Sequence, residues 1–338
     1  MRAAVFKGIG QPLQVENVPD PSPEATELVV EVSYCGICGT DLHSTREGAF
    51  AAECDSILGH EFCGHIAEVG SAMKGQWAIG DRVTALPFIG CGVCKSCING
   101  RPFECLQVKL TGMNTPGGFA EYVKTGASET IKLPDDLTMQ SAALIEPLAV
   151  GLHAVRVAQL KAGERVLIIG AGPVGLAVSL WCQFFGAKDV LVSEMAEQRR
   201  AMAKQMGATG TLTPGATLGE EFANLSGGAP DVIFECVGAP GLLQESINIA
   251  PRRSRIVPVG VCEEPDTIIP LQALVKELSM YFAIAYTRDD FETVIAMLGQ
   301  KRIDATPMIT DIVKLDDMPA AFEALRSPTS QCKVLTEL

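Results

Sequence analysis

The sequence lacks the features that mark several classes of protein. Its 338 residues hold 27 lysines and arginines against 40 aspartates and glutamates, for a formal charge of −13. This shortage of basic charge argues against nucleic acid or an anionic membrane surface as a partner. The N-terminus has no apolar core long enough for a signal peptide, and no repeat or low-complexity tract occurs. We therefore expect a soluble, cytoplasmic protein.

One uncharged stretch, residues 166–187, has nearly the length of a membrane span. It contains four glycines and Pro173, and its first half is rich in β-branched residues. We interpret it as a buried strand followed by a helix, so that no segment is expected to enter a membrane.

The cysteines are the most informative residues. Twelve are too few for a disulfide scaffold in a chain of this length, and in a reducing compartment clustered cysteines indicate metal ligands. Four of them form a C-x2-C-x2-C-x7-C cluster, namely Cys91, Cys94, Cys97 and Cys105. The intervening glycines, asparagine and proline predict a loop rather than a helix or strand. Four thiolates in one loop predict a closed, structural Zn²⁺ site, and the acidic chain disfavours the alternative of a nucleic-acid-binding zinc ribbon.

A second group of metal-competent residues is dispersed along the chain. Cys38 is followed by His60 and Glu61, and a thiolate, an imidazole and a carboxylate can bind Zn²⁺ while leaving one position open for substrate. The spacing alone leaves two other interpretations. Cys38 can be a packed small residue, or it can form a C-x2-C thiol redox motif with Cys35.

A glycine-rich turn follows the apolar run 165–169 and precedes a helical pattern. In this context the G-x-G-x-x-G motif predicts a dinucleotide site, with the pyrophosphate at the helix N-terminus. Glu194 ends the next predicted strand, where a carboxylate binds the adenosine ribose and repels a 2′-phosphate. NAD is therefore favoured over NADP, although Arg199 and Arg200 could accommodate the phosphate. The residues predicted to form the turn are Gly170, Gly172, Pro173, Val174 and Gly175.

Strand and helix patterns alternate through residues 150–286, which predicts a doubly wound parallel sheet. Residues 1–149 show short β runs, many turns and both metal motifs. Residues 287–338 add one amphipathic helix and are expected to return to the first domain. Further strands are expected at 231–236, 255–260 and 280–285, with helices at 241–250, 271–278 and 291–298.

These motifs and their order resemble the zinc-dependent medium-chain alcohol dehydrogenases over the whole chain. The matching segments are residues 38–43, 59–64, 117–122 and 170–175, together with the four-cysteine loop. The resemblance implies an α/β protein with three parts. These are a GroES-like β-rich catalytic domain (1–149), a Rossmann NAD-binding domain (150–286) and the C-terminal return (287–338).

The resemblance also implies two zinc ions per chain, one catalytic and one structural. It places Cys38 and His60 on the catalytic zinc, with Glu61 beside it as an exchangeable or neighbouring ligand. Glu146 stands where liver-type enzymes carry cysteine, as in the sorbitol, threonine and 2,3-butanediol dehydrogenase branch. Glu146 can alternatively be an acid of a helix N-terminus ahead of Pro147. Implied contacts to NAD include Glu194, Arg199, Val237 and Val259.

By the same resemblance, Thr40 takes the alcohol proton and passes it through the nicotinamide ribose to His43, while Asp41 orients a ligand imidazole. Ala285 replaces an arginine common in polyol-specific members, so a secondary alcohol, a vicinal diol or the ketone is the expected small-molecule substrate. A sugar-polyol or threonine-type dehydrogenase, a zinc-free reductase and a non-enzymatic binding protein remain alternatives. The resemblance favours a homo-oligomer, as a tetramer rather than a dimer.

Overall fold

The computed structural model describes residues 1–327 and 330–338, which form two compact units. Unit 1 comprises Met1–Glu146 and Thr287–Leu338, and unit 2 comprises Pro147–Tyr286. The first boundary lies slightly before residue 149, because most of α4 (Ile145–Val157) packs on unit 2, where Trp181 Nε1 donates to the Leu148 carbonyl at 2.9 Å.

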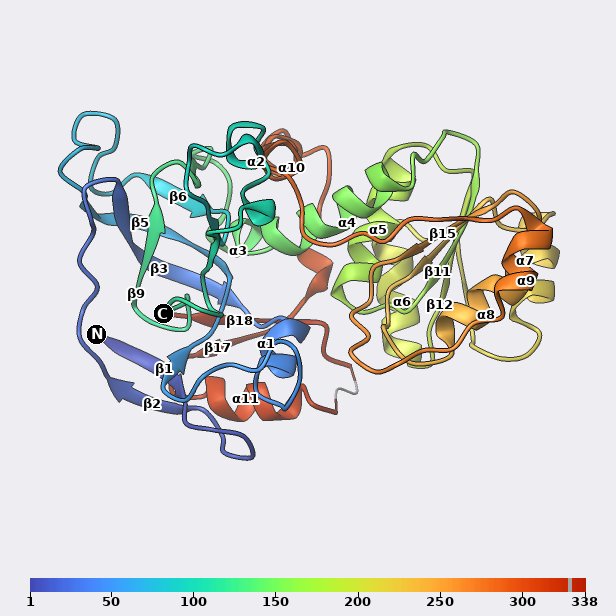
Figure 1. Cartoon of the computed structure of the whole chain (residues 1–338), viewed down its shortest axis with the longest axis horizontal. Coiled ribbons are helices and arrows are strands. Elements are labelled where there is room, and N and C mark those ends of the chain that lie inside the picture. Colours follow the sequence, from blue (N-terminus) through green and yellow to red (C-terminus); the bar gives the residue numbers. More distant parts are fainter. Residues whose placement is uncertain (328–329) are drawn as a thin grey trace. The chain divides into compact units, whose positions relative to one another are not determined.

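Unit 1 is built from antiparallel and mixed sheets (Figure 1). The largest has the strand order β10-β6-β5-β3-β18-β17, and β9 pairs with the N-terminal half of β3. Its strands are β3 (Glu27–Gly36), β5 (Glu61–Val69), β6 (Arg82–Ala85), β9 (Tyr122–Gly126), β10 (Thr130–Lys132), β17 (Ile309–Lys314) and β18 (Lys333–Glu337). Two smaller sheets contain β1 (Arg2–Phe6), β2 (Gln14–Asn17) and β4 (Ser56–Ile57), and β7 (Phe88–Ile89) and β8 (Lys109–Leu110).

Helices of unit 1 are short except for one. They are α1 (Gly39–Ser44), α2 (Lys95–Ile98), α3 (Met139–Ala142), α10 (Arg288–Gly299) and α11 (Met318–Ala324), with 3₁₀ turns at Pro102–Glu104 and Thr306–Met308. The expected helix at 291–298 is α10, which starts earlier because Thr287 and Asp290 form a capping box. The return segment also contains β17, β18 and α11, which the sequence analysis did not predict.

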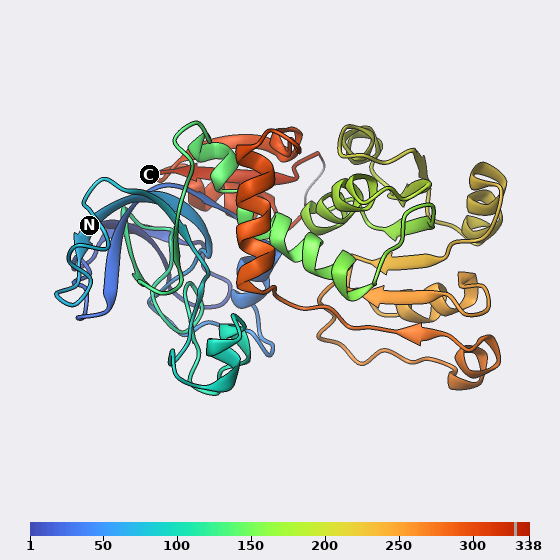
Figure 2. The ribbon, with the colours of Figure 1, turned by 90° about the horizontal axis from the view of Figure 1, so that it is seen from above.

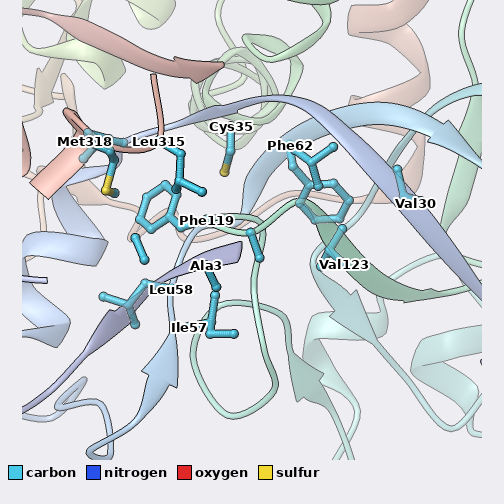
Figure 3. Packing of buried hydrophobic residues seen from close by; sticks show 14 of the residues in the cluster. Ala3, Val30, Cys35, Ile57, Leu58, Phe62, Phe119, Val123, Leu315 and Met318 are labelled. Carbon is cyan, nitrogen blue, oxygen red and sulfur yellow. The ribbon is translucent and has the colours of Figure 1, made fainter. Parts of the chain in front are cut away.

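The core of unit 1 lies between its sheets and α11. Figure 3 shows Phe119 beside Leu315, Met318 and Leu58, with Phe62 and Val123 farther along the cluster. Phe119 is fully buried and meets Phe322 edge-on at a centroid distance of 6.5 Å. The return segment therefore completes the core of the N-terminal domain instead of forming one of its own.

Unit 2 is a six-stranded parallel sheet in the order β13-β12-β11-β14-β15-β16. The arrows of this sheet that are visible in Figure 2 point the same way. Helices α5 and α6 lie on one face and α7, α8 and α9 on the other (Figure 1). The strands are β11 (Arg165–Ile169), β12 (Asp189–Ser193), β13 (Gly210–Leu212), β14 (Val232–Glu235), β15 (Arg255–Pro258) and β16 (Ser279–Met280), and the helices are α5 (Pro173–Phe184), α6 (Glu197–Gln205), α7 (Leu218–Ser226), α8 (Leu242–Ile249) and α9 (Pro270–Lys276).

The expected strand 280–285 is wrong in extent, because β16 covers Ser279–Met280 only. Its neighbour β15 ends at Pro258, which has no N–H to continue the ladder. Ala285 then takes a positive φ of 58°, which ends the extended conformation. The uncharged stretch 166–187 forms β11 and α5, as predicted. Among the described residues, no helix combines the length and apolar character needed to cross a bilayer.

Candidate metal and cofactor sites

Cys38, His60 and Glu61 are brought together by the pairing of two antiparallel strands. β3 ends at Gly36 shortly before Cys38, and Gly36 is the Cα partner of Glu61, the first residue of β5. One ligand atom from each of the three side chains lies within 4.8 Å of the others. The thiolate, imidazole and carboxylate fit Zn²⁺ as a donor set. Residues dispersed in the sequence thus form one candidate metal site.

Asp41 is buried and contacts both the Cys38 and the His60 ends of this group. Cys38 is the N-cap of α1 and Asp41 is the third residue of this helix. Oδ2 of Asp41 accepts the N–H of Cys38 at 2.9 Å, as in a capping box. Its Oδ1 lies 3.3 Å from Nδ1 of His60 and accepts the N–H of Gly59 at 3.2 Å. Because Nδ1 faces the carboxylate, Nε2 is the nitrogen that can bind a metal. This geometry suits Asp41 as a positioning residue.

Glu61 is also paired with a buried lysine that the sequence analysis did not single out. Nζ of Lys333 lies 2.6 Å from both carboxylate oxygens of Glu61 and donates to the carbonyl of Ile37 at 3.1 Å. Burial alone would lower the pKa of Lys333, but the charges of Glu61 and Cys38 raise it well above its usual value. No local motif marks this lysine, and only the pairing of β18 with β3 brings it to the site.

Glu146 does not belong to the group of three. It lies in the first turn of α4, and among the described residues its carboxylate is not one of the ligand atoms that lie within 4.8 Å of one another. Ligand atoms lie about 2.0 to 2.3 Å from a zinc ion. A direct bond from Glu146 to an ion held by Cys38 and His60 would therefore require at least one of the three side chains to shift.

Thr40 and His43 both lie on α1, the helix that Cys38 caps. Both side chains are partly buried. Their i, i+3 spacing makes them neighbours on one face of the helix. The two residues expected to carry a proton thus sit side by side on the element that begins at a candidate metal ligand.

The four-cysteine cluster has the geometry of a closed site. One sulfur from each of Cys91, Cys94, Cys97 and Cys105 lies within 4.8 Å of the others. The prediction of a loop without helix is wrong here, because Lys95–Ile98 form α2 and Pro102–Glu104 a 3₁₀ turn. The helical turn brings residues three apart to the same side, so that Sγ of Cys94 and Sγ of Cys97 are 3.5 Å apart.

Backbone amides surround these sulfurs. The N–H groups of Cys91 and Gln107 donate to Sγ of Cys105 at 3.5 and 3.4 Å. Amide hydrogen bonds, that of Val93 foremost, lower the pKa of Cys91 to about 6, whereas burial raises that of Cys97 to about 12. Thiols this close cannot all ionise without a cation among them. The arrangement fits Zn²⁺, which binds thiolates and whose tetrahedral coordination is complete with four of them.

The glycine-rich turn joins β11 to α5 in unit 2. Gly170 has a φ of +98°, Gly172 is the N-cap of α5, and Pro173 occupies the first helical position, followed by Val174. A Cβ on Gly175 would lie 2.0 Å from the carbonyl oxygen of Gly170, so no larger residue fits. The turn exposes the N-terminus of α5 to an anion, as a pyrophosphate site requires.

Glu194 lies directly beside this turn. Its Oε2 accepts the N–H of Ala171 and its Oε1 accepts the N–H of Ala196, both at 2.9 Å. Nη1 of Arg200 donates to the backbone carbonyls of Glu194 and Met195, both at 2.6 Å. Arg199 is partly buried on α6. The two valines expected at the cofactor follow neighbouring strands, Val237 after β14 and Val259 after β15.

Comparison with known proteins agrees with this geometry. The alcohol dehydrogenase GroES-like domain family matches residues 24–135, and the zinc-binding dehydrogenase family matches residues 173–300. The (R,R)-butanediol dehydrogenase of Bacillus subtilis is 32% identical over 338 residues, covering 96% of both chains. The chain belongs to the zinc-dependent medium-chain alcohol dehydrogenases. The predicted fold class, a GroES-like domain with a Rossmann domain, is confirmed.

Two solved structures resemble this dehydrogenase along its whole length. An alcohol dehydrogenase from Escherichia coli in complex with NADH has a TM-score of 0.92 and 30% identity. A zinc-binding dehydrogenase from Sinorhizobium meliloti bound to NADP has a TM-score of 0.90 and 33% identity. Each covers 100% of this chain and is itself covered to 99%. The dehydrogenase is an oxidoreductase that acts on CH–OH groups of small molecules, as its family does.

Proposed function

We propose that this dehydrogenase transfers a hydride between NAD(H) and a secondary alcohol or vicinal diol, or the corresponding ketone. The observation that carries the proposal is the convergence of Cys38, His60 and Glu61, a zinc-competent group that supplies three ligands where a tetrahedral ion takes four. The similarity to a butanediol dehydrogenase supports a vicinal diol in particular.

The two clusters support a content of two zinc ions per chain. We propose that Cys38 and His60 hold the catalytic ion, with Glu61 or Glu146 as the carboxylate, and that Cys91, Cys94, Cys97 and Cys105 hold the structural ion. A catalytic Zn²⁺ supplies Lewis acidity that lowers the pKa of an alcohol substrate. Asp41 contributes by orienting His60 and fixing the start of α1. Lys333 balances the charge of Glu61.

Proton transfer is assigned to α1. The hydroxyl of Thr40 accepts the proton of the alcohol, and His43 on the same helix face delivers it to solvent. Histidine suits this role because its ordinary pKa lies near neutral pH.

Glu194 supports NAD over NADP. Its carboxylate is held beside the glycine-rich turn by two amides and carries a negative charge that would repel a 2′-phosphate. Arg200, one of the two arginines that could accommodate such a phosphate, donates from Nη1 to two backbone carbonyls. A Glu194→Gly variant should lose most of its preference for NAD⁺, measured as the ratio of kcat/KM with NAD⁺ to that with NADP⁺. An unchanged ratio would contradict the assignment.

We further propose that the chain acts as a homo-oligomer, a tetramer rather than a dimer, in the cytoplasm. Strand β16 is an edge of the parallel sheet, and exposed apolar side chains gather around it at Ile269, Leu271, Leu274, Val275, Tyr281, Phe282 and Ile284. Such an apolar edge favours association. A solution mass of 35.8 kDa would contradict the oligomer.

The substrate is tested by NAD⁺ reduction across primary alcohols, secondary alcohols, vicinal diols, sugar polyols and L-threonine. Ala285 offers no bidentate donor for a hydroxyl-rich chain, so secondary alcohols or vicinal diols should give the highest kcat/KM. A preference for polyols or L-threonine would replace the proposed substrate class. No turnover with any compound at full zinc loading would overturn the proposal, and turnover that survives removal of both zinc ions would indicate a zinc-free reductase.

A further inference from the structure

Two glutamates flank the glycine-rich turn, and only one has a role in the proposed cofactor site. β11 lies between β12 and β14, and Ile169, its last residue, is the Cα partner of Ser193 on one side and of Glu235 on the other. Glu194 follows Ser193, so the two carboxylates stand at the carboxyl ends of the strands on either side of the turn. Glu235 is nevertheless buried, with an exposed fraction of 5%.

The side chain of Glu235 closes a tight turn with its own successors. Its Oε1 accepts the N–H of Val237 at 2.7 Å and that of Gly238 at 2.9 Å. Its backbone carbonyl accepts the N–H groups of Val259 and Gly260 at 2.8 and 2.9 Å. Burial raises the pKa of Glu235, and the hydrogen bonds from the two amides oppose that rise. One residue thus fixes the segments that follow both β14 and β15.

The turn that Glu235 holds presses against the glycine-rich turn. A Cβ on Gly170 would lie 2.6 Å from Cγ2 of Val237, so the valine occupies the space that a side chain at Gly170 would need. Gly238 has a φ of +75°, and a Cβ there would lie 2.3 Å from the carbonyl oxygen of Val261. Val237 itself is 51% exposed, an apolar side chain presented at the rim of the cofactor turn.

We infer that Glu235 is a positioning residue of the dinucleotide site, which holds Val237 against Gly170 so that the cofactor meets a preformed wall. A buried carboxylate is costly unless its hydrogen bonds are made, and here the bonds are made to the turn that carries the exposed valine. The inference rests on the proposed cofactor site. It assigns the two flanking acids different tasks, since Glu194 discriminates between the two dinucleotides and Glu235 shapes the site for both.

The experiment is a fluorescence titration of the zinc-loaded protein with NADH and with NADPH. Glu235→Ala removes both side-chain hydrogen bonds and should raise the Kd for each cofactor about tenfold, leaving their ratio unchanged. Glu235→Gln keeps a carbonyl oxygen that can accept both N–H groups and should restore both Kd values to within about threefold. Glu164→Ala is the matched control, because Glu164 also accepts a backbone N–H and pairs with Arg255, but at the opposite end of β11.

The outcomes separate this inference from the proposed function. A wild-type protein that binds neither dinucleotide would remove the proposed function itself. If the wild type binds and Glu235→Ala has the same Kd values as the wild type, the inference is wrong. It is also wrong if Glu164→Ala and Glu235→Ala weaken binding equally and lower Tm equally, because Glu235 then has a structural role only. A change in the ratio of the two Kd values in Glu235→Ala would also overturn it, because discrimination would then not belong to Glu194 alone.

Discussion

The two candidate metal sites of unit 1 are equally compact but are assembled differently. The four cysteines lie within one turn-rich segment and are gathered by a single helical turn and its neighbours. Cys38, His60 and Glu61 come from the end of one strand and the start of another, and they depend on Asp41 and Lys333 for orientation and charge balance. The first site is local, whereas the second is assembled by the sheet.

The two candidate sites therefore depend on different parts of the chain. A local cluster of four thiolates can form wherever its loop is intact, and its metal contributes chiefly to stability. A site assembled from distant strands requires the whole domain, including the C-terminal strand β18, and its function depends on residues that do not bind the metal.

Cys38→Ser should abolish turnover while leaving the fold intact. Loss of the thiolate removes the catalytic zinc, and with it several kcal/mol of transition-state stabilisation, so kcat/KM should fall at least about a thousandfold. Metal analysis should show one zinc ion per chain, and Tm should stay close to that of the wild type. Cys63→Ala, a buried thiol outside both clusters, is the control and should keep both ions. Full activity of Cys38→Ser would contradict the assignment of the site.

Lys333→Met should destabilise unit 1 strongly. It leaves the buried carboxylate of Glu61 without its ion pair, at a cost of about 3–5 kcal/mol in the free energy of unfolding. Adding Glu61→Gln should restore most of the loss, because the uncompensated charge is then gone. Urea unfolding of the two variants measures this. If the double variant is no more stable than Lys333→Met, the pair is not the cause.

Cys94→Ser should affect stability more than chemistry. We expect the loss of the structural zinc and about 3 kcal/mol of stability, which lowers Tm by about 10 °C in a domain of this size. Turnover at 20 °C, measured where the variant is still folded, should remain within about tenfold of the wild type. A loss as large as that of Cys38→Ser would mean that the local cluster also serves catalysis.

Asp41→Ala should weaken zinc binding at the assembled site by about 10- to 100-fold, because His60 and Cys38 lose their common hydrogen-bonding partner. Competition with a chelator of known affinity measures the change. Asp290→Ala is a matched control, since Asp290 is equally buried and accepts the N–H of Thr287 at 2.8 Å in the capping box of α10. The N-terminus of α10 contacts the four-cysteine loop, where Arg288 N–H donates to the carbonyl of Gly100, so the comparison is made on zinc bound at the assembled site. Equal loss of zinc from the assembled site in both variants would mean that general destabilisation of unit 1 is responsible, and would contradict the positioning role of Asp41.

Much of the fold could be predicted because its signals are local. The apolar run of β11, the glycines after it and the proline at the first position of α5 report backbone geometry directly. Helix α2 was missed because four residues with a glycine-rich context carry too weak a periodicity. Strands β17 and β18 and helix α11 were missed because short elements form only against a core that another part of the chain supplies.

The chemical groups of both candidate sites are evident from the order of the residues: the four clustered thiols, the glycine-rich turn, the acid that follows β12 and the types of residue near Cys38. Those features are local in the chain, and their spacing alone limits what they can bind. The folded chain adds what no motif contains: His60 turns Nδ1 to Asp41, Lys333 neutralises Glu61, the group of three forms without Glu146, and Glu235 holds Val237 against Gly170. These contacts join residues through sheet pairing and burial, and neither leaves a periodic trace in the sequence.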